Sequence, residues 1–270
     1  MNDAKRDALE KTALEVRKDV VRMSGVAKSH GLSSALTVVD LLVYLYWERM
    51  KIFPRERNAP GRDRLVLSSG FAAPALYACL SKLGFFERDE LWSYRRLGGM
   101  LQGYPDIRTP GVDAPGGTSG LGIALGLALS LRMDGAGGNV YCIIDREEMH
   151  NGAVWESIEA APAMMPLNLV MIVEYGGSLE KNAPAPLSKR LAAFGWHVNV
   201  ADGHDMGAIE MAFQSSGGSC PLAIIAITGG SREYYGAFEP RTPDEPLSMD
   251  DIERTLSKLD IDANKRGGQE

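Results

Sequence analysis

The stretch NVYCIIDREEMHNGAVWESIEAA, residues 139–161, decides the fold. Its first six residues, 139–144, form a continuous apolar run, which is typical of a strand buried on both faces of a sheet. A short polar run separates this strand from residues 152–160, where the pattern favours a helix. Strand, polar turn and helix in this order form the repeating unit of a parallel sheet.

The same alternation continues on both sides of this stretch. We expect further strands at residues 65–67, 168–174, 197–201 and 221–228. We expect helices at residues 3–24, 38–47, 72–83, 119–132, 187–194 and 206–213, and a last helix that begins at Ser248 with Asp251 as its capping partner. The fold class is therefore predicted to be α/β, a parallel sheet covered by helices on both faces.

The domain organisation follows from the evenness of this pattern. No internal repeat or linker interrupts it, so we expect a single domain over residues 1–262 and a disordered tail at residues 263–270. Long loops at residues 98–118 and 229–247 are rich in glycine and proline. Long loops in compact domains are usually functional, which makes these two segments of interest.

The composition is that of an ordinary globular protein and argues against several classes. The 270 residues are 45% hydrophobic, and the net charge of −6 disfavours a nucleic-acid binder, which needs a basic face. No apolar run approaches the roughly 20 residues of a membrane span, and the charged N-terminus lacks a signal-peptide core. Three separated cysteines, Cys79, Cys142 and Cys220, fit a reducing compartment. We therefore expect a cytoplasmic protein that binds neither nucleic acid nor a membrane.

Several stretches together carry a resemblance to a known family. They are RDRLVLSSGFAAPALYACLSKLGFF (62–86), LQGYPD (101–106), GVDAPGG (111–117), NVYCIIDREEMHNGAVWESIEAAPAMMPLNLVMIVEYGG (139–177) and AFGWHVNVADGHD (193–205). In order, spacing and hydrophobic pattern the chain resembles the N-terminal, diphosphate-binding half of transketolase, in the version in which the enzyme is split into two subunits. The resemblance implies a thiamine-diphosphate-binding α/β fold, in agreement with the parallel sheet covered on both faces.

The sequence departs from the family pattern at the family's metal site. In the family, Gly-Asp-Gly follows the strand, and its Asp binds the divalent cation that holds the cofactor's diphosphate. Without a gap these positions are Asp145-Arg146-Glu147; a one-residue shift would keep Asp145 as a ligand but needs an insertion before Gly152. The second ligand, an Asn in a pattern like Asp-Asn-Asn-Gly, corresponds to Gly176 in residues 174–177. We prefer the gapless register, which replaces both ligands of the cation and leaves no family-type metal site.

The histidines of the family are also replaced. Its Ser-Lys-Gly-His-Ala motif corresponds to Ser68–Ala72 with Phe71 in place of His, and its Gly-His-Pro motif to residues 103–105 with Tyr104 in that place. Another Gly-His-Pro corresponds to His30-Gly31-Leu32, and the late Lys-Gly-x-Gly and Trp-His region to GGSREYYGAF (229–238). In the family these imidazoles bind substrate hydroxyls and move protons, for which a phenyl ring or a phenol is a poor substitute. His204 matches the family scaffold, and we expect it to be structural.

Polar residues around the replaced positions form a candidate ligand pocket. Its members are Arg146, Glu148, His150, Asn151, Tyr104, Glu174 and Tyr175. In one interpretation Arg146 is a fork for an anionic or polar substrate at the carboxyl end of a strand, where such sheets bind ligands. In the other, Arg–Glu salt bridges fill the former metal site. Gly116 and Gly117 either approach a cofactor closely or form a turn that needs a positive φ.

Three functions remain open. The first is one subunit of a two-component transketolase-like complex, a heterodimer or heterotetramer with a C-terminal-like, pyrimidine-binding companion, with altered chemistry and neither thiamine diphosphate nor metal expected. The second is a non-catalytic structural or regulatory partner of such a subunit. The third is conventional two-carbon ketol transfer with thiamine diphosphate and Mg²⁺. Because the family's active site lies between two domains and this sequence supplies one, we expect no activity from the chain alone.

Overall fold

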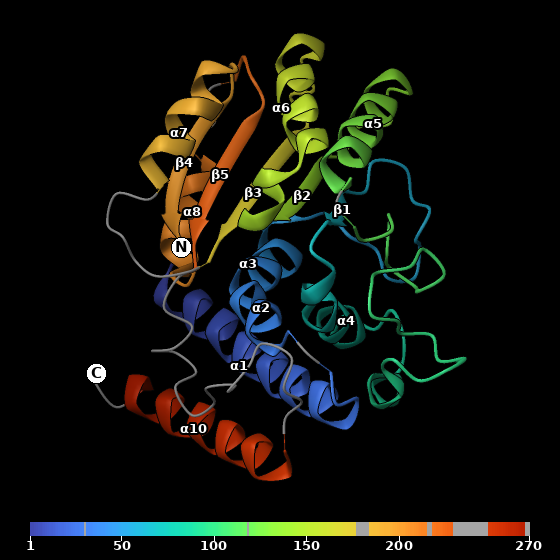
Figure 1. Cartoon of the computed structure of the whole chain (residues 1–270), viewed down its shortest axis with the longest axis vertical. Coiled ribbons are helices and arrows are strands. Elements are labelled where there is room, and N and C mark those ends of the chain that lie inside the picture. Colours follow the sequence, from blue (N-terminus) through green and yellow to red (C-terminus); the bar gives the residue numbers. More distant parts are fainter. Residues whose placement is uncertain (30, 118, 177–183, 215–217, 229–247, 268–270) are drawn as a thin grey trace.

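A parallel sheet lies at the centre of the molecule (Figure 1). The structure is a computed structural model and describes residues 1–29, 31–117, 119–176, 184–214, 218–228 and 248–267. Within these residues five strands pair in the order β1-β2-β3-β5-β4, every neighbouring pair parallel. They are β1 (Arg64–Leu67), β2 (Val140–Asp145), β3 (Leu169–Tyr175), β4 (His197–Asp202) and β5 (Leu222–Ile227). The predicted fold class is confirmed.

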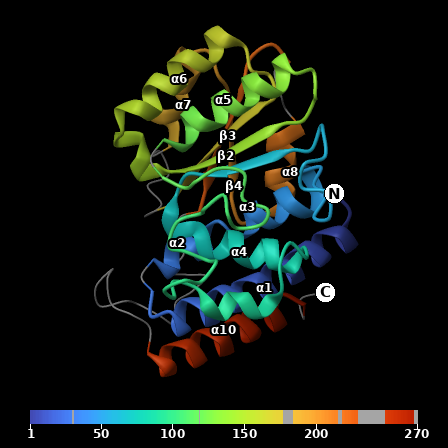
Figure 2. The same cartoon turned by 90° about the vertical axis from the view of Figure 1, so that its right-hand side faces the viewer.

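Helices cover both faces of this sheet, as Figures 1 and 2 show. One face carries α5 (Gly120–Met133), α6 (Gly152–Met164) and α7 (Pro184–Ala193). The other face carries α1 (Asp3–Val26), α2 (Leu32–Thr37), α3 (Val39–Tyr44), α4 (Ala73–Lys82) and α8 (Met206–Gln214), with α10 (Met249–Gly267) packed on the outer side of α1. No helix of the described residues combines the length and the apolar character that a membrane crossing requires.

Each inner strand is apolar on both sides because both of its faces are covered. In β2, Val140, Cys142 and Ile144 belong to the core beneath α5, α6 and α7. Tyr141 and Ile143, on the alternate positions, belong to the core beneath α1 to α4. All five side chains are fully buried. This is why the sequence shows a continuous apolar run there, without the alternation of a sheet that faces water.

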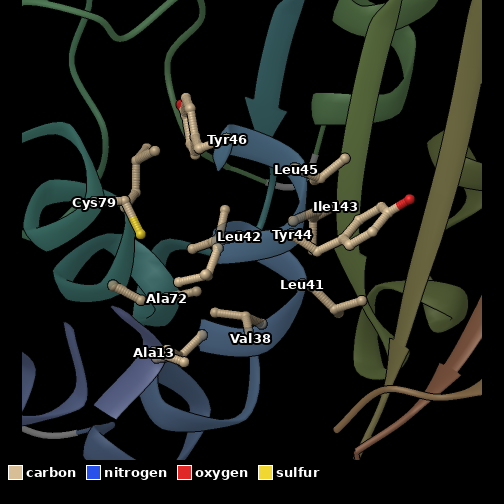
Figure 3. Close-up of a cluster of buried hydrophobic side chains, with 14 of the residues drawn as sticks. Ala13, Val38, Leu41, Leu42, Tyr44, Leu45, Tyr46, Ala72, Cys79 and Ile143 are labelled. Carbon is tan, nitrogen blue, oxygen red and sulfur yellow. The ribbon is translucent and has the colours of Figure 1, made fainter. Parts of the chain in front are cut away.

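The larger core is built around the segment that contains α3 (Figure 3). Leu41, Leu42 and Leu45 of this segment are at most 1% exposed. The Tyr44 ring stacks on Phe213 of α8 at a centroid distance of 5.4 Å. The predicted helix over residues 38–47 is in fact α3 followed by a π-helical turn at Leu45–Arg49. Sequence periodicity does not separate these two forms, since they differ by one residue in hydrogen-bond spacing.

The described part of the long loop, residues 98–117, is held in place by the buried Tyr77 side chain and by backbone hydrogen bonds. The hydroxyl of Tyr77, from α4, donates to the carbonyl oxygens of Gln102 at 2.9 Å and Tyr104 at 3.0 Å. Further along, the Gly116 N–H donates to the carbonyl of Pro105 at 2.9 Å. The loop therefore has a defined path along the β1 edge of the sheet.

The last helix is tied to the first. Ser248 and Asp251 form the predicted cap, with the Asp251 N–H donating to the Ser248 hydroxyl at 3.2 Å. Where α10 crosses α1, a Cβ on Gly25 would lie 2.1 Å from the end of the Ile252 side chain, so a larger residue at position 25 would require this side chain to move. The helix continues to Gly267, which corrects the predicted tail at 263–270: residues 263–267 are helical because no helix breaker precedes the glycine. Residues 268–270 and the predicted loop 229–247 lie outside the described residues.

Candidate functional site

Polar side chains gather at the carboxyl ends of the central strands. Ser68 follows β1, Asp145 and Glu174 lie at the ends of β2 and β3, and Thr228 follows β5. Asp145 and Glu174 are register partners on neighbouring strands. In open α/β sheets this edge is where ligands bind.

The turn after β2 is closed by its own carboxylates. Asp145 accepts a hydrogen bond from the Glu147 N–H at 2.8 Å, and Glu148 accepts one from the Asp145 N–H at 3.0 Å. Together they form a capping box on the 3₁₀ turn Arg146–His150. Asn151 caps the next helix by accepting from the Ala153 N–H at 3.0 Å. Two predicted pocket residues, Glu148 and Asn151, thus shape the backbone.

Ser68 connects this turn to the glycine-rich loop. Its hydroxyl bonds the Glu148 carboxylate and lies 2.6 Å from the Gly117 carbonyl, and the Gly117 N–H donates to the Ser68 carbonyl at 2.9 Å. Gly117 has a φ of +142°, which favours glycine. A Cβ on Gly120 would lie 2.5 Å from the Ser68 Cβ. Gly117 thus adopts the positive φ that one of the two predicted alternatives describes, and a Cβ on it would meet no atom within 4 Å.

Arg146 contacts β3 and not its acidic neighbours. Its guanidinium donates to the Gly176 carbonyl at 3.3 Å and lies 5.1 Å from the centre of the Tyr175 ring. Among the residues that the structure describes, no carboxylate lies within 4.0 Å of it, so the predicted Arg–Glu salt bridges are not formed there. A guanidinium has five N–H donors, and among the residues that the structure describes Arg146 uses one of them, in its bond to Gly176.

Burial raises the pKa of three carboxyl groups around Arg146. These are Asp145, Glu148 and Glu174; in each case desolvation is the largest cause. Glu174 is 6% exposed and accepts a hydrogen bond from the Thr228 hydroxyl, which counters the shift without cancelling it. The nearby charge of Asp145 raises the pKa of Glu174 further.

A second buried cluster lies between α1, α3 and the end of β4. Arg17 donates to the Asp40 carboxylate, and the His204 Nδ1 lies 2.8 Å from the same carboxylate. Although burial alone would raise it, the pKa of Asp40 is lowered by the charge of Arg17 and the bond to His204. The sequence marked His204 as structural, but it gave no signal for Arg17 or Asp40, which lie far from it in the chain.

The other predicted pocket residues lie further out. Tyr104 is 57% exposed, and so is Phe71, which replaces a family histidine and lies in the 3₁₀ turn Gly70–Ala72 after β1. A Cβ on Gly70 would lie 2.0 Å from the Tyr104 ring, so Tyr104 packs on the loop after β1 and not on Arg146. His150 is exposed at the end of the 3₁₀ turn. His30 and residues 229–238 lie outside the described residues.

With the fold and the edge of the sheet defined, comparison with known proteins decides the family. Residues 15–265 match the family described as transketolase, thiamine diphosphate binding domain. The chain belongs to the transketolase family. In this family the matched domain is the one that binds thiamine diphosphate. The resemblance predicted from the sequence is confirmed.

Relatives of the transketolase family differ in how much of their length this chain covers. It is 34% identical over 239 residues to the 6-deoxy-6-sulfo-D-fructose transketolase subunit of Clostridium sp. (strain MSTE9), covering 84% of this chain and 87% of that protein. It is 31% identical over 266 residues to the transketolase of Homo sapiens, covering 94% of this chain but 42% of that protein. The chain therefore spans less than half of the longer relative.

Solved transketolase structures share the fold. The transketolase of Campylobacter jejuni superimposes with a TM-score of 0.74 at 22% identity, over 98% of this chain and 48% of that chain. The transketolase from Leishmania mexicana gives 0.73 at 18% identity, over 95% and 46%. At these identities the likeness establishes the architecture of the domain.

Proposed function

We propose that this chain is one subunit of a two-component transketolase-like enzyme whose shared site has altered chemistry. Its companion would be a C-terminal-like, pyrimidine-binding subunit, in a heterodimer or heterotetramer. The coverage of relatives supports this division. The chain matches nearly the whole of a protein named as a transketolase subunit, but only the first part of a longer transketolase.

The outward face of α5 supports a companion subunit. From Gly120 to Leu131 this helix has no charged residue. Gly122, Gly126 and Ser130 are exposed along it, and Ile123 and Leu127 are half-buried beside them. Small and apolar residues of this kind favour close helix contact over solvation. The helix begins beside Ser68, so a companion docked there would border the site.

The residues at the ends of β2 and β3 do not fit the family's divalent cation. In the gapless register the two ligand positions are Arg146 and Gly176, and in the structure the guanidinium of one donates to the carbonyl of the other. A cation there would meet a fixed positive charge and few oxygen ligands. Within the described residues no group of three or more His, Cys, Asp or Glu side chains is arranged to hold a metal ion.

Arg146 carries the proposal. In the gapless register it takes the position of a metal ligand, and its side chain contacts one carbonyl and one ring, with no carboxylate within 4.0 Å among the described residues. The carboxylates of Asp145 and Glu148 are occupied by backbone N–H groups and Ser68. Arg146 would therefore hold an anionic group of the ligand through charge-assisted hydrogen bonds, without a metal.

One observation favours the structural alternative. Glu148 and Asn151 are both used to cap local structure, so part of the polar cluster serves the fold. A non-catalytic partner would need no more than this. The two functions differ in whether Arg146 affects ligand binding.

The first test addresses cofactor and metal. The chain is purified with its companion subunit, and thiamine diphosphate is titrated by calorimetry with Mg²⁺ and with a chelator. We expect no binding that depends on the metal. Tight binding that the chelator abolishes would restore conventional transketolase chemistry.

The second test compares two arginines in similar surroundings. Arg146 lies over Tyr175, and Arg190 of α7 lies over Trp155 at 5.3 Å, away from the strand ends. Arg146→Ala should weaken binding or turnover of the assembled complex about tenfold or more, since a charge-assisted hydrogen bond contributes about 1.5–3 kcal/mol. Arg146→Lys should restore part of it, and Arg190→Ala should have no effect. Equal behaviour of the Arg146→Ala and Arg190→Ala variants would leave the structural partner as the better reading.

A further inference from the structure

A cavity of about 180 Å³ lies outside the candidate site, beside the segment that precedes β1. One wall is formed by residues 52–62, and the other by residues 107–113 of the long loop, with Phe85 between them. On the right of Figure 1 these two segments lie along the same edge of the sheet. Since residues 52–62 lead into β1, the cavity is at the amino end of that strand, whereas the candidate site is at the carboxyl ends.

Apolar side chains form part of the walls of this cavity. Phe85, Val112 and Ile52 are half-buried in it, and Phe53 and Ile107 are 45% and 66% exposed beside them. Exposed apolar side chains that converge on one hollow are typical of a binding site. A cavity of roughly 150 Å³ is enough to hold benzene in another protein, so a single ring fits this volume.

The polar side of the cavity is cationic. Arg62 is committed, since it donates to the Asp113 carboxylate and to the carbonyls of Arg57 and Asp63. By contrast, the side chains of Arg57 and Asn58 make no hydrogen bond or ion pair with any residue that the structure describes. Two groups of donors at the cavity are therefore free to bind a ligand.

The surrounding sequence gives the same sign of charge. Residues 51–64 carry five basic and two acidic side chains, whereas the whole chain has a net charge of −6. The cavity thus lies in a locally positive segment of an acidic protein. A positive region with low-dielectric walls attracts anions.

We infer that this cavity binds a small molecule that combines a ring-sized apolar group with one anionic group, with Arg57 as the anion's partner. Phe85 and Val112 receive the apolar group, and Asn58 adds a neutral donor at the rim. The long loop joins this cavity to the candidate site, because residues 107–113 line one and residues 116–117 border the other.

The test uses ligand-observed NMR on the purified chain with four compounds. Benzoate and phenyl phosphate carry both a ring and an anion, benzamide lacks the charge, and inorganic phosphate lacks the ring. We expect saturable binding of the first two, in the millimolar range that is ordinary for fragments of about ten atoms. The preferred one of the two identifies the anion as a carboxylate or a phosphate. Binding of inorganic phosphate as tight as that of benzoate, or no saturable binding of either ring compound, would overturn the inference.

Variants locate the binding. Arg57→Ala should weaken benzoate binding about tenfold, and Asn58→Phe should abolish it by filling the cavity while keeping the charge. Arg55→Ala is the matched control: it removes the same charge from the same segment, but Arg55 does not line the cavity. Arg57, Asn58 and Arg55 are all exposed, so all three variants should fold, which circular dichroism checks. Equal loss in the Arg57→Ala and Arg55→Ala variants would show that the basic segment, and not the cavity, attracts the anion.

Discussion

The two buried polar clusters at the carboxyl edge of the sheet are almost equally buried and behave in opposite ways. Asp40 is 4% exposed and Glu174 is 6% exposed. The Arg17 guanidinium holds the pKa of Asp40 below its usual value, whereas burial without a bonded cation raises the pKa of Glu174. Burial alone therefore does not set the charge of a carboxyl group here; the presence of a cation within hydrogen-bond distance does.

The difference separates a structural cluster from a candidate site. Arg17 and His204 both bond the Asp40 carboxylate, so this cluster joins α1, α3 and the end of β4. At the ends of β2 and β3, Arg146 bonds a carbonyl while the carboxyl groups bond hydroxyl and N–H groups. Carboxyl groups whose pKa is shifted by burial and by neighbouring charges are found at functional sites.

The largest expected loss of stability follows a change in the cluster of Arg17, Asp40 and His204. Arg17→Ala leaves the Asp40 carboxylate buried with only His204 beside it, and should lower the free energy of unfolding by about 3–5 kcal/mol. Chemical denaturation measures this. Arg22→Ala is the control, because Arg22 is exposed and 3.8 Å from Asp19; it should cost less than about 1 kcal/mol. Similar losses in both variants would contradict a special role for the Arg17–Asp40 pair.

The second largest loss of stability is expected when the hydrogen bond between Ser68 and Glu148 is removed. Ser68→Ala removes the hydroxyl that bonds the Glu148 carboxylate, and should cost about 1–3 kcal/mol in the free energy of unfolding. It should also raise the pKa of Glu148 further, because that bond favours the ionised form. Thermal and urea unfolding give the first quantity, and NMR titration gives the second. Ser130→Ala, on the exposed face of α5, should change neither.

At Glu174 we expect a smaller change, and a gain in stability where the two preceding variants lose it. Its raised pKa means that the folded state binds a proton more tightly than the unfolded chain, so stability falls as pH rises from about 4.3 through the folded pKa. Glu174→Gln keeps an acceptor for Thr228 and removes this loss, so the variant should be more stable than the wild type at about pH 8 and similar at about pH 4.

Unfolding measured at both pH values checks this. The charge of Asp40 contributes in the other direction, since its stabilising effect is present above about pH 3.9 and lost below it. A Glu174→Gln variant that is less stable at every pH would show that Glu174 is ionised and bonded as Asp40 is.

The smallest change in stability is expected for Arg146. Arg146→Ala removes one carbonyl bond and one ring contact, which together contribute about 1–2 kcal/mol in a half-exposed position. A loss of 3 kcal/mol or more by denaturation would show that Arg146 stabilises the fold as Arg17 does, and would contradict the difference between the two clusters.

The fold could be predicted well from the sequence because its strands are covered on both faces. The continuous apolar runs in residues 139–144 and 168–174 have no other common explanation, and the structure places β2 and β3 there within one residue at each end. The short helices were predicted less well. Residues 32–37 and the π turn at 45–49 depend on packing between α1 and α4, which no local pattern encodes.

The sequence predicted which residues lie at this edge of the sheet, but not which contacts they make. The sequence brought Arg146, Glu174 and Tyr175 to one edge of the sheet, and the structure agrees. It did not predict that Glu148 would bond Ser68, because those residues are 80 positions apart in the chain. Nor did it indicate Arg17 and Asp40, since a charged residue on a helix is usually solvated and only the tertiary fold buries this pair.

The contact between Gly25 and Ile252 joins two segments that the ribosome synthesises at very different times. Helix α1 is synthesised more than two hundred residues before α10, which packs on it at Gly25. At the usual 5–20 residues per second, this contact forms roughly 10–50 s after α1 is made. Pulse-labelled ribosome complexes should therefore show the end of α1 near Gly25 better protected from protease after residue 252 has left the exit tunnel.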